Sequence, residues 1–551
     1  MRSPVSGWAA PMVGLYMILA LPLAWLARFQ LNADGIGYIQ LARHWARGEF
    51  DLSVSSWWSP LLSWLLIPFV WANVEPVLAA KLLNVGFGLG FAVGVTALVK
   101  ELTGGPGRHV ALAGGLLMAL VMLPEPVTPD LLVTFLLTWY FVLSMQLFRS
   151  TSLALAAGIG ILGGLAYLAK AYALPFVLLH LTATVLFKWK LVKRDPISPA
   201  FKQYAVSLVA LAIVVSPWIA VISRQDGHLT ISSAGKHWSA FSPVPADKPR
   251  TSERMLQNPR PGRMLVWENP VEARQPWPIW SPLDGLRGLR NEVVQIARNL
   301  LVLRNYLGMA DLLGLLPVSF VFAIIFLFPL REVPQSHGRI LRSWVCLSVA
   351  LYMGGYMLVF LQDRYLWPIW GMLLALAIAG PDVPELRTIG NGRVNVGYRS
   401  VTGSTFALWH RLVILVLVTS IAMNVGRKFY EWTGPSGKHA WTAGWKRAGS
   451  QFSPGCRFAA SEQGLGLFIT YWSTGAYIGE LSSKTPEGIA RELAPFDNVT
   501  VLVPKTITLP LAAALSASPL FTPLNIDNDI VKAFGFNGST CAQASGARLL
   551  D

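Results

Sequence analysis

Long apolar runs dominate the chain and constrain its fold more than any other feature. Only 13% of its 551 residues are charged, whereas a soluble domain carries about 25%. The sequence therefore predicts a polytopic α-helical membrane protein with about eleven transmembrane helices of roughly 20 residues each, of which the first is retained. The expected spans are residues 11–28, 77–99, 109–123, 130–147, 153–168, 171–187, 204–222, 306–330, 343–361, 365–380 and 411–426.

One further run, residues 58–72 (WSPLLSWLLIPFVWA), is short and contains Pro68, so it fits either a span or a re-entrant segment. The distribution of charge favours the second interpretation. If this run does not cross, one set of short loops collects most of the basic residues, and such loops mark the cytoplasmic side. We therefore expect the N-terminus inside and the C-terminus outside. The net charge of +16 then belongs to inner loops and lipid headgroups rather than to nucleic-acid binding.

This topology divides the chain into a membrane domain, residues 1–426, and an outer C-terminal domain, residues 427–551. Two further outer segments are the loops 29–76, with amphipathic helices, and 223–305. The segments FAAS, GAYIGEL, TPEGIARELAPF and NVTVLVP indicate that the C-terminal domain is a small α/β unit. It holds Cys456 and Cys541, which an oxidising outer compartment would allow to pair; the alternative is two free thiols.

The stretch NADGIGYIQLARHWARG, residues 32–48, follows the first apolar run directly. Its apolar side chains recur at helical spacing, Arg43 and His44 lie on the other side, and Gly48 can end the helix. A basic amphipathic helix next to a span is expected to lie in the interface plane. The sequence therefore places Asp34 at the outer membrane surface, between water and lipid headgroups.

Three more charged side chains approach the same level. Asp130 begins the fourth expected span, Lys170 lies between the fifth and sixth, and Arg364 lies between the ninth and tenth. Each has an ordinary alternative: Asp130 suits a helix N-cap, the two cations suit snorkelling, and Asp34 suits a solvated turn. Their common position on one membrane face makes a shared site the better interpretation.

Such a group of side chains has a definite chemistry. A carboxylate can take a proton from an acceptor hydroxyl, and Lys and Arg can neutralise a phosphate. A site at the membrane surface suits a donor whose phosphate lies at headgroup level while its tail lies in lipid. The sequence thus suggests a polyprenyl-phosphate sugar as the donor.

An ordered set of segments carries a resemblance to a known family. The segments are DGIGYIQLARHWARG, WWSPLLSWLL, TPDLLVTFLLTWY, GGLAYLAKAYALPFVLL and RYLWPIWGMLLALA, spread over residues 32–380. In this order they resemble the bacterial GT-C glycosyltransferases of the protein-O-mannosyltransferase and aminoarabinose-transferase type, which are family 39-like. The resemblance implies an inverting glycosyltransferase that uses a polyprenyl-phosphate sugar at the periplasmic face of the inner membrane. The acceptor, a lipid glycan, a polysaccharide or a protein, stays open.

The resemblance also implies roles for individual residues. Asp34 matches the family's first-loop catalytic aspartate, and Asp130 matches a second acidic position. Lys170 and Arg364 match basic positions associated with the donor phosphate. In many relatives a glutamate follows the first aspartate, whereas here Gly35 does. It therefore stays open whether Asp34 acts alone, acts with Asp130, or binds a divalent metal such as Mg²⁺ or Mn²⁺.

Several neighbours of these residues complete the candidate site. Arg43 and His44 are candidates for contact with the phosphate, and their alternative is an ordinary interfacial polar face. Aromatic residues near the four charged positions are candidates for lining the substrate, and their alternative is the aromatic belt at the membrane surface. These aromatic residues are Tyr38, Trp57, Trp58, Tyr167 and Tyr365.

Two other classes of protein compete with the enzyme interpretation. A transporter or flippase for a lipid-linked glycan would carry its polar residues near the bilayer midplane, often in broken helices related by repeats. A non-catalytic scaffold would display the C-terminal domain and would not need four charged residues to converge. The charged residues at one edge favour the transferase over both alternatives.

Overall fold

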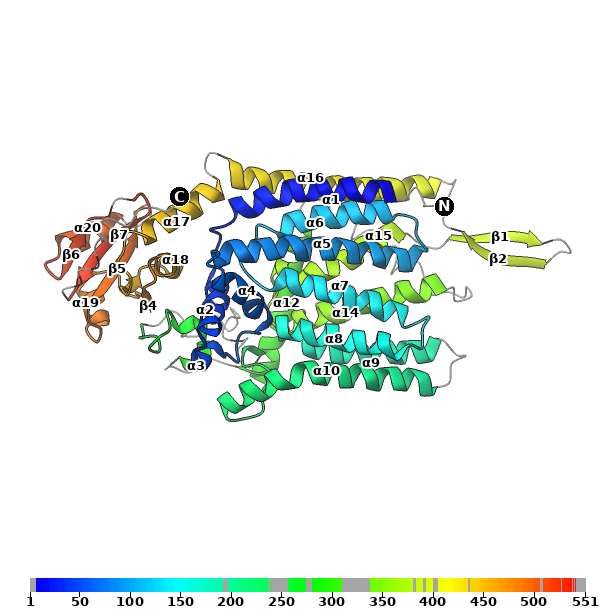
Figure 1. The fold of residues 1–551 in the computed structure, drawn as a ribbon, viewed down its shortest axis with the longest axis horizontal. Coiled ribbons are helices and arrows are strands. Elements are labelled where there is room, and N and C mark those ends of the chain that lie inside the picture. Colours follow the sequence, from blue (N-terminus) through cyan, green and yellow to red (C-terminus); the bar gives the residue numbers. More distant parts are fainter. Residues whose placement is uncertain are drawn as a thin grey trace.

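Long helices lying side by side form most of the molecule (Figure 1). The computed structural model describes residues 6–191, 197–235, 239, 256–273, 280–309, 337–379, 383–389, 393–399, 405–434, 437–505, 509–526, 528–537, 539 and 541. The helices of the bundle are α1 (Ser6–Leu26), α5 (Pro76–Thr103), α6 (Arg108–Met122), α7 (Asp130–Gln146), α8 (Leu153–Ala169), α9 (Ala173–Leu191), α10 (Ile197–Asp226), α14 (His337–Met357), α15 (Trp367–Ala379) and α16 (Thr405–Thr433).

Each of these helices coincides with an expected apolar run; of the remaining expected run, 306–330, residues 306–309 belong to the helix Gly285–Met309 and the rest lie outside the described residues. Four described helices are long and apolar enough to cross a bilayer: Gly7–Leu26, Pro76–Thr103, Pro199–Asp226 and Ile340–Met357. The polytopic membrane class is therefore supported, while the number of spans stays a prediction.

Small residues let neighbouring helices approach closely. A Cβ added to Gly160 of α8 would lie 2.2 Å from the carbonyl oxygen of Ser207 in α10. A Cβ added to Gly115 of α6 would lie 2.8 Å from the Cα of Ala92 in α5. Such contacts are typical of helices that pack within a membrane, where close approach of the backbones stabilises their association.

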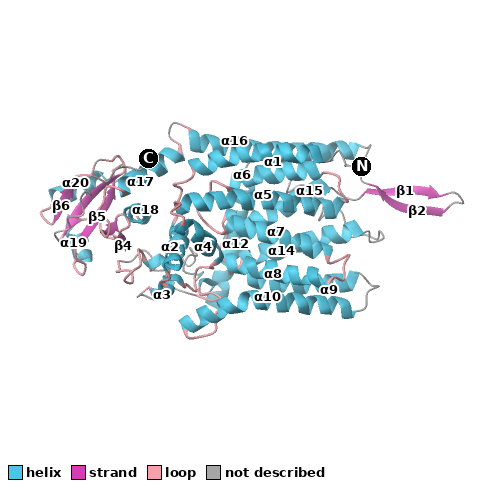
Figure 2. Ribbon diagram, viewed as in Figure 1, coloured by secondary structure: helices cyan, strands magenta, loops and turns pink. Residues whose placement is uncertain are grey.

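Short helices gather at the end of the bundle that carries the C-terminal domain (Figures 1 and 2). They are α2 (Ala33–Arg47), α3 (Phe50–Ser53) and α4 (Leu61–Trp71), which packs against α2. With 11 residues, α4 rises only about 17 Å, which is too short to cross a hydrocarbon core of about 30 Å. The ambiguous run 58–72 therefore contains a short helix, and its assignment as a segment that does not cross stays a prediction.

The outer loop contributes three further elements. These are η2 (Val266–Glu268), η3 (Pro270–Glu272) and α12 (Gly285–Met309). Among the side chains of α12 that the structure describes, residues 285–303, the buried ones are polar, namely Glu292, Gln295 and Asn299, while Leu286 and Leu289 are exposed. This burial pattern suits a helix that turns its apolar side to lipid.

The C-terminal domain is a small α/β unit, as the sequence predicts. Its sheet has the strand order β4-β3-β5-β7-β6, in which β3 pairs in parallel with β4 and β5, and β7 pairs antiparallel with β5 and β6. The strands are β3 (Arg457–Ala460), β4 (Ala476–Glu480), β5 (Val499–Pro504), β6 (Phe521–Leu524) and β7 (Val531–Phe536). The helices are α17 (Lys438–Gly449), α18 (Gln463–Ser473), α19 (Pro486–Leu493) and α20 (Leu509–Ala517).

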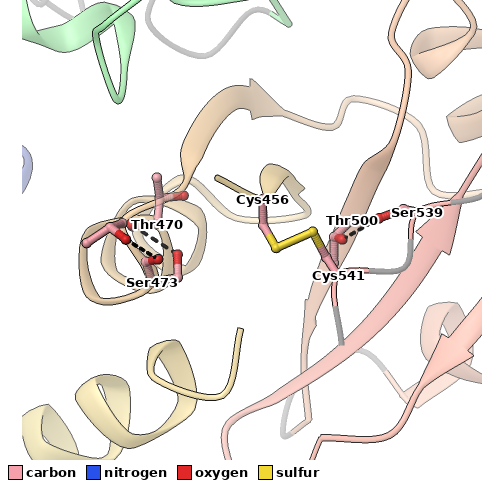
Figure 3. The surroundings of a disulfide bond; sticks show 7 residues. Cys456, Thr470, Ser473, Thr500, Ser539 and Cys541 are labelled. Carbon is pink, nitrogen blue, oxygen red and sulfur yellow. Dashed lines mark hydrogen bonds between the residues drawn. A yellow bond between two sulfur atoms is a disulfide. The ribbon is translucent and has the colours of Figure 1, made fainter. Parts of the chain in front are cut away.

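The C-terminal half also contains a disulfide and a β-hairpin. Cys456 and Cys541 form a disulfide that closes the C-terminal domain (Figure 3). A hairpin, β1 (Val383–Ile389) with β2 (Arg393–Arg399), lies at the opposite end of the bundle, where the sequence analysis expected only a basic loop.

Candidate active site

Four charged residues expected to share a site converge in the structure. Arg364 Nη2 lies 2.8 Å from Asp34 Oδ2, and Arg364 Nε lies 3.4 Å from Asp130 Oδ2. Lys170 Nζ forms an ion pair with Asp130 Oδ1. The guanidinium therefore joins carboxylates from α2 and α7, and the ammonium adds a second cation from the end of α8.

Local structure explains how each carboxylate reaches this point. The side chain of Asn32 caps α2 by accepting a hydrogen bond from the Gly35 N–H at 2.8 Å, which sets Asp34 in the first turn. Gly48, with a left-handed φ of 72°, ends the same helix as expected. Asp130 is the first residue of α7 and follows Pro129, so its side chain lies at that end of the helix bundle.

The cations are placed by breaks in helices. Lys170 caps the C-terminus of α8 with an extended backbone, and its ammonium lies 3.5 Å from the centre of the Tyr365 ring, a favourable cation–π geometry. Arg364 lies in η4 (Asp363–Leu366), where its Nε donates to Gln362 Oε1 at 2.7 Å. Upstream of η4, Asn299 of α12 donates to the carbonyl oxygen of Met357 at 2.8 Å, which holds the end of α14.

The electrostatics of the cluster follow from its partial burial. Asp130 is 3% exposed, Arg364 15%, Lys170 20% and Asp34 26%. Burial, opposed by Asp130 and reinforced by Arg364, lowers the pKa of Lys170 to about 8. Two carboxylates thus balance two cations, and Asp34 is the acid that solvent reaches most easily.

A steric contact explains why no second acid directly follows Asp34. A Cβ added to Gly35 would lie 2.9 Å from both the Cβ and the carbonyl oxygen of Val127. Val127 belongs to the turn that leads to Asp130, and it is buried. The packing of α2 on this turn therefore leaves no space for a glutamate at position 35.

The predicted aromatic residues form two groups. Tyr38 packs on Trp58 with ring centres 5.0 Å apart, and Trp57 and Trp58 both contact Trp267, a residue that sequence reasoning missed. Tyr38 is also close to the charged cluster: burial, followed by the charges of Asp34 and Asp130, raises its pKa well above the usual value. A role for these aromatic residues in lining substrate stays a prediction.

The other two aromatic residues lie nearer to Lys170. Tyr365 lies beneath the Lys170 ammonium and stacks on Tyr356 with ring centres 5.0 Å apart. Tyr167 is buried and donates its hydroxyl to the carbonyl oxygen of Ile231 at 2.8 Å. Tyr365 therefore contacts the cluster directly, whereas the Tyr167 hydroxyl supports the segment that follows α10.

Arg43 and His44 both have protein partners in the structure, and their predicted contact with the donor phosphate stays a prediction. His44 Nε2 lies 2.9 Å from Glu268, and His44 Nδ1 lies 2.6 Å from Glu49. Burial alone would lower the pKa of His44, but the two carboxylates outweigh burial and raise it. Arg43 Nη2 lies 3.4 Å from the hydroxyl of Tyr471 in α18. The outer loop and the C-terminal domain thus cover this side of α2.

The cluster does not fit a divalent metal. Throughout the part of the chain that the structure describes, no three His, Cys, Asp or Glu side chains are grouped as such an ion requires. Asp34 and Asp130 both face cations, so the negative charge that would attract a metal is already balanced. The chemistry proposed below therefore uses these four side chains alone.

Sequence reasoning missed three residues that support the site, namely Lys81, Glu125 and Lys428. Lys81 of α5 is fully buried, and its ammonium donates to the carbonyl oxygen of Glu125. The Glu125 carboxylate lies 2.5 Å from the ammonium of Lys428 in α16. A signal for Lys81 was present, since a single lysine inside the apolar run 77–99 is costly and calls for a partner.

The fold has counterparts among solved structures, although no family model and no curated protein sequence matches the chain. The chain is similar to the crystal structure of ArnT from Cupriavidus metallidurans bound to undecaprenyl phosphate, with a TM-score of 0.54 and 12% identity over 98% of this chain and 99% of that chain. It is less similar to the oligosaccharyltransferase AglB from Archaeoglobus fulgidus in complex with an inhibitory peptide and a dolichol-phosphate, with a TM-score of 0.48 and 12% identity over 91% and 69%.

The full-length match to ArnT, together with the helical bundle and the C-terminal domain, shows that this chain has a GT-C fold. GT-C is the fold of membrane glycosyltransferases. At 12% identity the likeness concerns the fold alone, so the function is argued from the site.

We expect replacement of Gly35 by alanine to destabilise the protein. Alanine would normally favour a helix by up to about 1 kcal/mol, but here the added methyl group clashes with the Val127 backbone, and overpacking costs roughly 1–3 kcal/mol. The measurement is the thermal unfolding midpoint in detergent. Gly86→Ala is the matched control, because a Cβ at Gly86 meets no atom within 4 Å. An unfolding midpoint of Gly35→Ala equal to that of Gly86→Ala would contradict the packing argument.

Proposed function

We propose that this protein is an inverting glycosyltransferase that moves a sugar from a polyprenyl-phosphate donor to an acceptor hydroxyl at the outer face of the membrane. The observation that carries the proposal is the convergence of Asp34, Asp130, Lys170 and Arg364 at one end of a GT-C bundle. The Arg364 guanidinium lies between the partly exposed carboxylate of Asp34 and the buried carboxylate of Asp130. This combination suits removal of a proton next to a phosphate-binding site.

The reaction we propose is a single displacement. Asp34 accepts the proton of the acceptor hydroxyl while the hydroxyl oxygen forms a bond to the anomeric carbon of the sugar. The bond from that carbon to the phosphate oxygen breaks on the opposite face, and its electron pair leaves with the polyprenyl phosphate. Lys170 and Arg364 stabilise the developing charge on the phosphate. Asp130 keeps both cations in place.

The position of the cluster supports an enzyme rather than a transporter. Asp130 begins α7 and Lys170 caps α8, so both lie at helix ends instead of at broken helices in the middle of the bundle. A lipid-linked donor can reach such a position with its phosphate at headgroup level and its tail beside the helices. A scaffold would have no use for a charged cluster that is only partly open to solvent.

The acceptor is expected to approach from the side of the C-terminal domain. Asp34, the most exposed acid of the cluster, lies on α2, and the outer loop and α18 contact the same helix. A lipid glycan, a polysaccharide and a protein hydroxyl are all acceptors of suitable chemistry. We propose the outer face of a bacterial inner membrane as the location.

Replacement of Asp34 by asparagine should abolish sugar transfer without loss of donor binding. Loss of a general base lowers kcat by about 10²–10⁴-fold, whereas Arg364, freed from Asp34, still binds phosphate. The measurement is transfer of label from a panel of radiolabelled polyprenyl-phosphate sugars to a membrane-glycan extract, with binding of undecaprenyl phosphate measured in parallel. Asp51→Asn is the control, because it makes the same chemical change at an exposed aspartate of the same loop. A kcat for Asp34→Asn within threefold of the wild type would remove Asp34 as the base.

The activity should fall at alkaline pH. Because the pKa of Lys170 is lowered to about 8, its ammonium is charged below pH 8 and becomes neutral above it. The proposed donor phosphate then loses a counter-charge, so kcat/KM for the donor falls by about tenfold per pH unit above that pKa. The measurement is the kcat/KM profile from pH 6.5 to 10. Lys170→Arg, which stays charged, should lose this alkaline limb; a flat wild-type profile over the same range is the contrary result.

A further inference from the structure

The turn formed by residues 123–129, with the sequence LPEPVTP, determines where Asp130 lies. It connects the end of α6 to the first residue of α7, which is Asp130 itself. Three prolines restrict its backbone, because each fixes φ near −65°. The separation between Asp34 and Asp130 therefore depends on how this Pro-rich turn is held against its surroundings.

On one side, the Pro-rich turn packs against α2. Val127 is buried beneath Gly35, so the turn and the residue after Asp34 are in direct van der Waals contact. This contact sets how closely α2 can approach the turn. It does not prevent the turn from moving away from α2.

On its other side, the turn is held by two lysines from different helices. Lys81 of α5 donates from its fully buried ammonium to the carbonyl oxygen of Glu125. Lys428 of α16 is 14% exposed, and its ammonium lies 2.5 Å from the Glu125 carboxylate. Lys428 also lies 3.9 Å from Glu431, which in turn pairs with Lys438 at 3.0 Å. A chain of alternating charges therefore runs from the start of α17 to the Pro-rich turn.

Burial of the Lys81 ammonium costs free energy, because the charge is removed from water. A methionine of similar length would occupy the same position in α5 without the cost of removing a charge from water, and replacing buried charges by apolar groups is often neutral or stabilising. The charge is therefore best explained by what it binds. That partner is the backbone of the segment that carries Asp130.

We propose that Lys81 and Lys428 are positioning residues for sugar transfer, which hold Glu125 so that Asp130 stays paired with Lys170 and Arg364. This inference rests on the proposed function. Neither lysine touches the four charged residues of the site, so their effect passes through the Pro-rich turn. Release of the turn would loosen Asp130 and, with it, the two cations, while leaving the chemical groups of the site unchanged.

The test compares Lys81→Met, Lys428→Gln and Glu125→Gln in the full-length protein. We expect kcat to fall by about tenfold or more while KM for the donor stays within threefold. Lys428→Gln and Glu125→Gln break the same ion pair, so the double variant should be no slower than either single variant. Lys428→Arg keeps the pair and should restore most of kcat. Arg411→Gln is the matched control, because Arg411 is an exposed cation of the same helix, α16, near the end away from Glu125.

Amide hydrogen exchange of residues 123–130 provides a readout that does not depend on activity. Faster exchange of this segment in Lys81→Met and Lys428→Gln, with the control unchanged, supports the proposal that the two lysines hold the Pro-rich turn. Exchange at the wild-type rate overturns it, and so does wild-type kcat in spite of faster exchange. If the wild type itself transfers no sugar, the proposed function fails, and the exchange result alone then decides whether the two lysines hold the turn. If Lys81→Met does not fold, Lys428→Gln and Glu125→Gln still test whether release of the Pro-rich turn lowers kcat and speeds amide exchange.

Discussion

The contact of one guanidinium with two carboxylates organises the site. Asp34 and Asp130 come from helices far apart in the sequence, and two carboxylates brought together in a partly buried place repel each other. Arg364 removes that repulsion by contacting both, and Lys170 balances the remaining charge. Because loss of one partner from a buried ion pair leaves an uncompensated charge, the four side chains depend on one another.

The same arrangement explains how a phosphate could be accommodated. The cations are already desolvated and oriented, so a phosphate that enters exchanges one anionic partner for another instead of ordering flexible side chains. Arg364 lies in a short 3₁₀ helix, and Asn299 of α12 holds the end of the helix before it. The outward-facing apolar residues of α12 would lie in lipid, so a helix in contact with the bilayer also supports the Arg364 turn.

Local signals in the sequence were enough to predict the bundle and the cluster. Asp34, Asp130, Lys170 and Arg364 each stand at the end of an apolar run, and a polar residue in such a place must find a partner, so their convergence could be expected. The strands FAAS and NVTVLVP of the C-terminal domain were equally readable, because alternation and flanking turns are local properties. The chemical roles of the four residues stay proposals.

What the sequence did not reveal depends on contacts between distant segments. The covering of α2 by Glu268 and Tyr471 could not be expected, because nothing within residues 32–48 indicates that the outer loop and α18 pack on them. The hairpin β1–β2 was missed for a different reason, because its signal is local: Val394, Val396 and Tyr398 alternate with other residues, and the pair Asn-Gly at 391–392 is typical of a hairpin turn. The glycine that follows Asp34 looked like a departure from the pattern of the family that the sequence resembles. Only the packing of Gly35 on Val127 gives this departure a steric reason.

The most direct test of the central claim is the equilibrium binding of undecaprenyl phosphate, measured against undecaprenol, to the wild type and to Arg364→Met. The account predicts that the wild type binds the phosphorylated lipid at least tenfold more tightly than the alcohol, and that Arg364→Met loses most of this preference. Equal affinity of the wild type for both lipids, or an undiminished preference in Arg364→Met, would show that the charged cluster is not a phosphate-binding site.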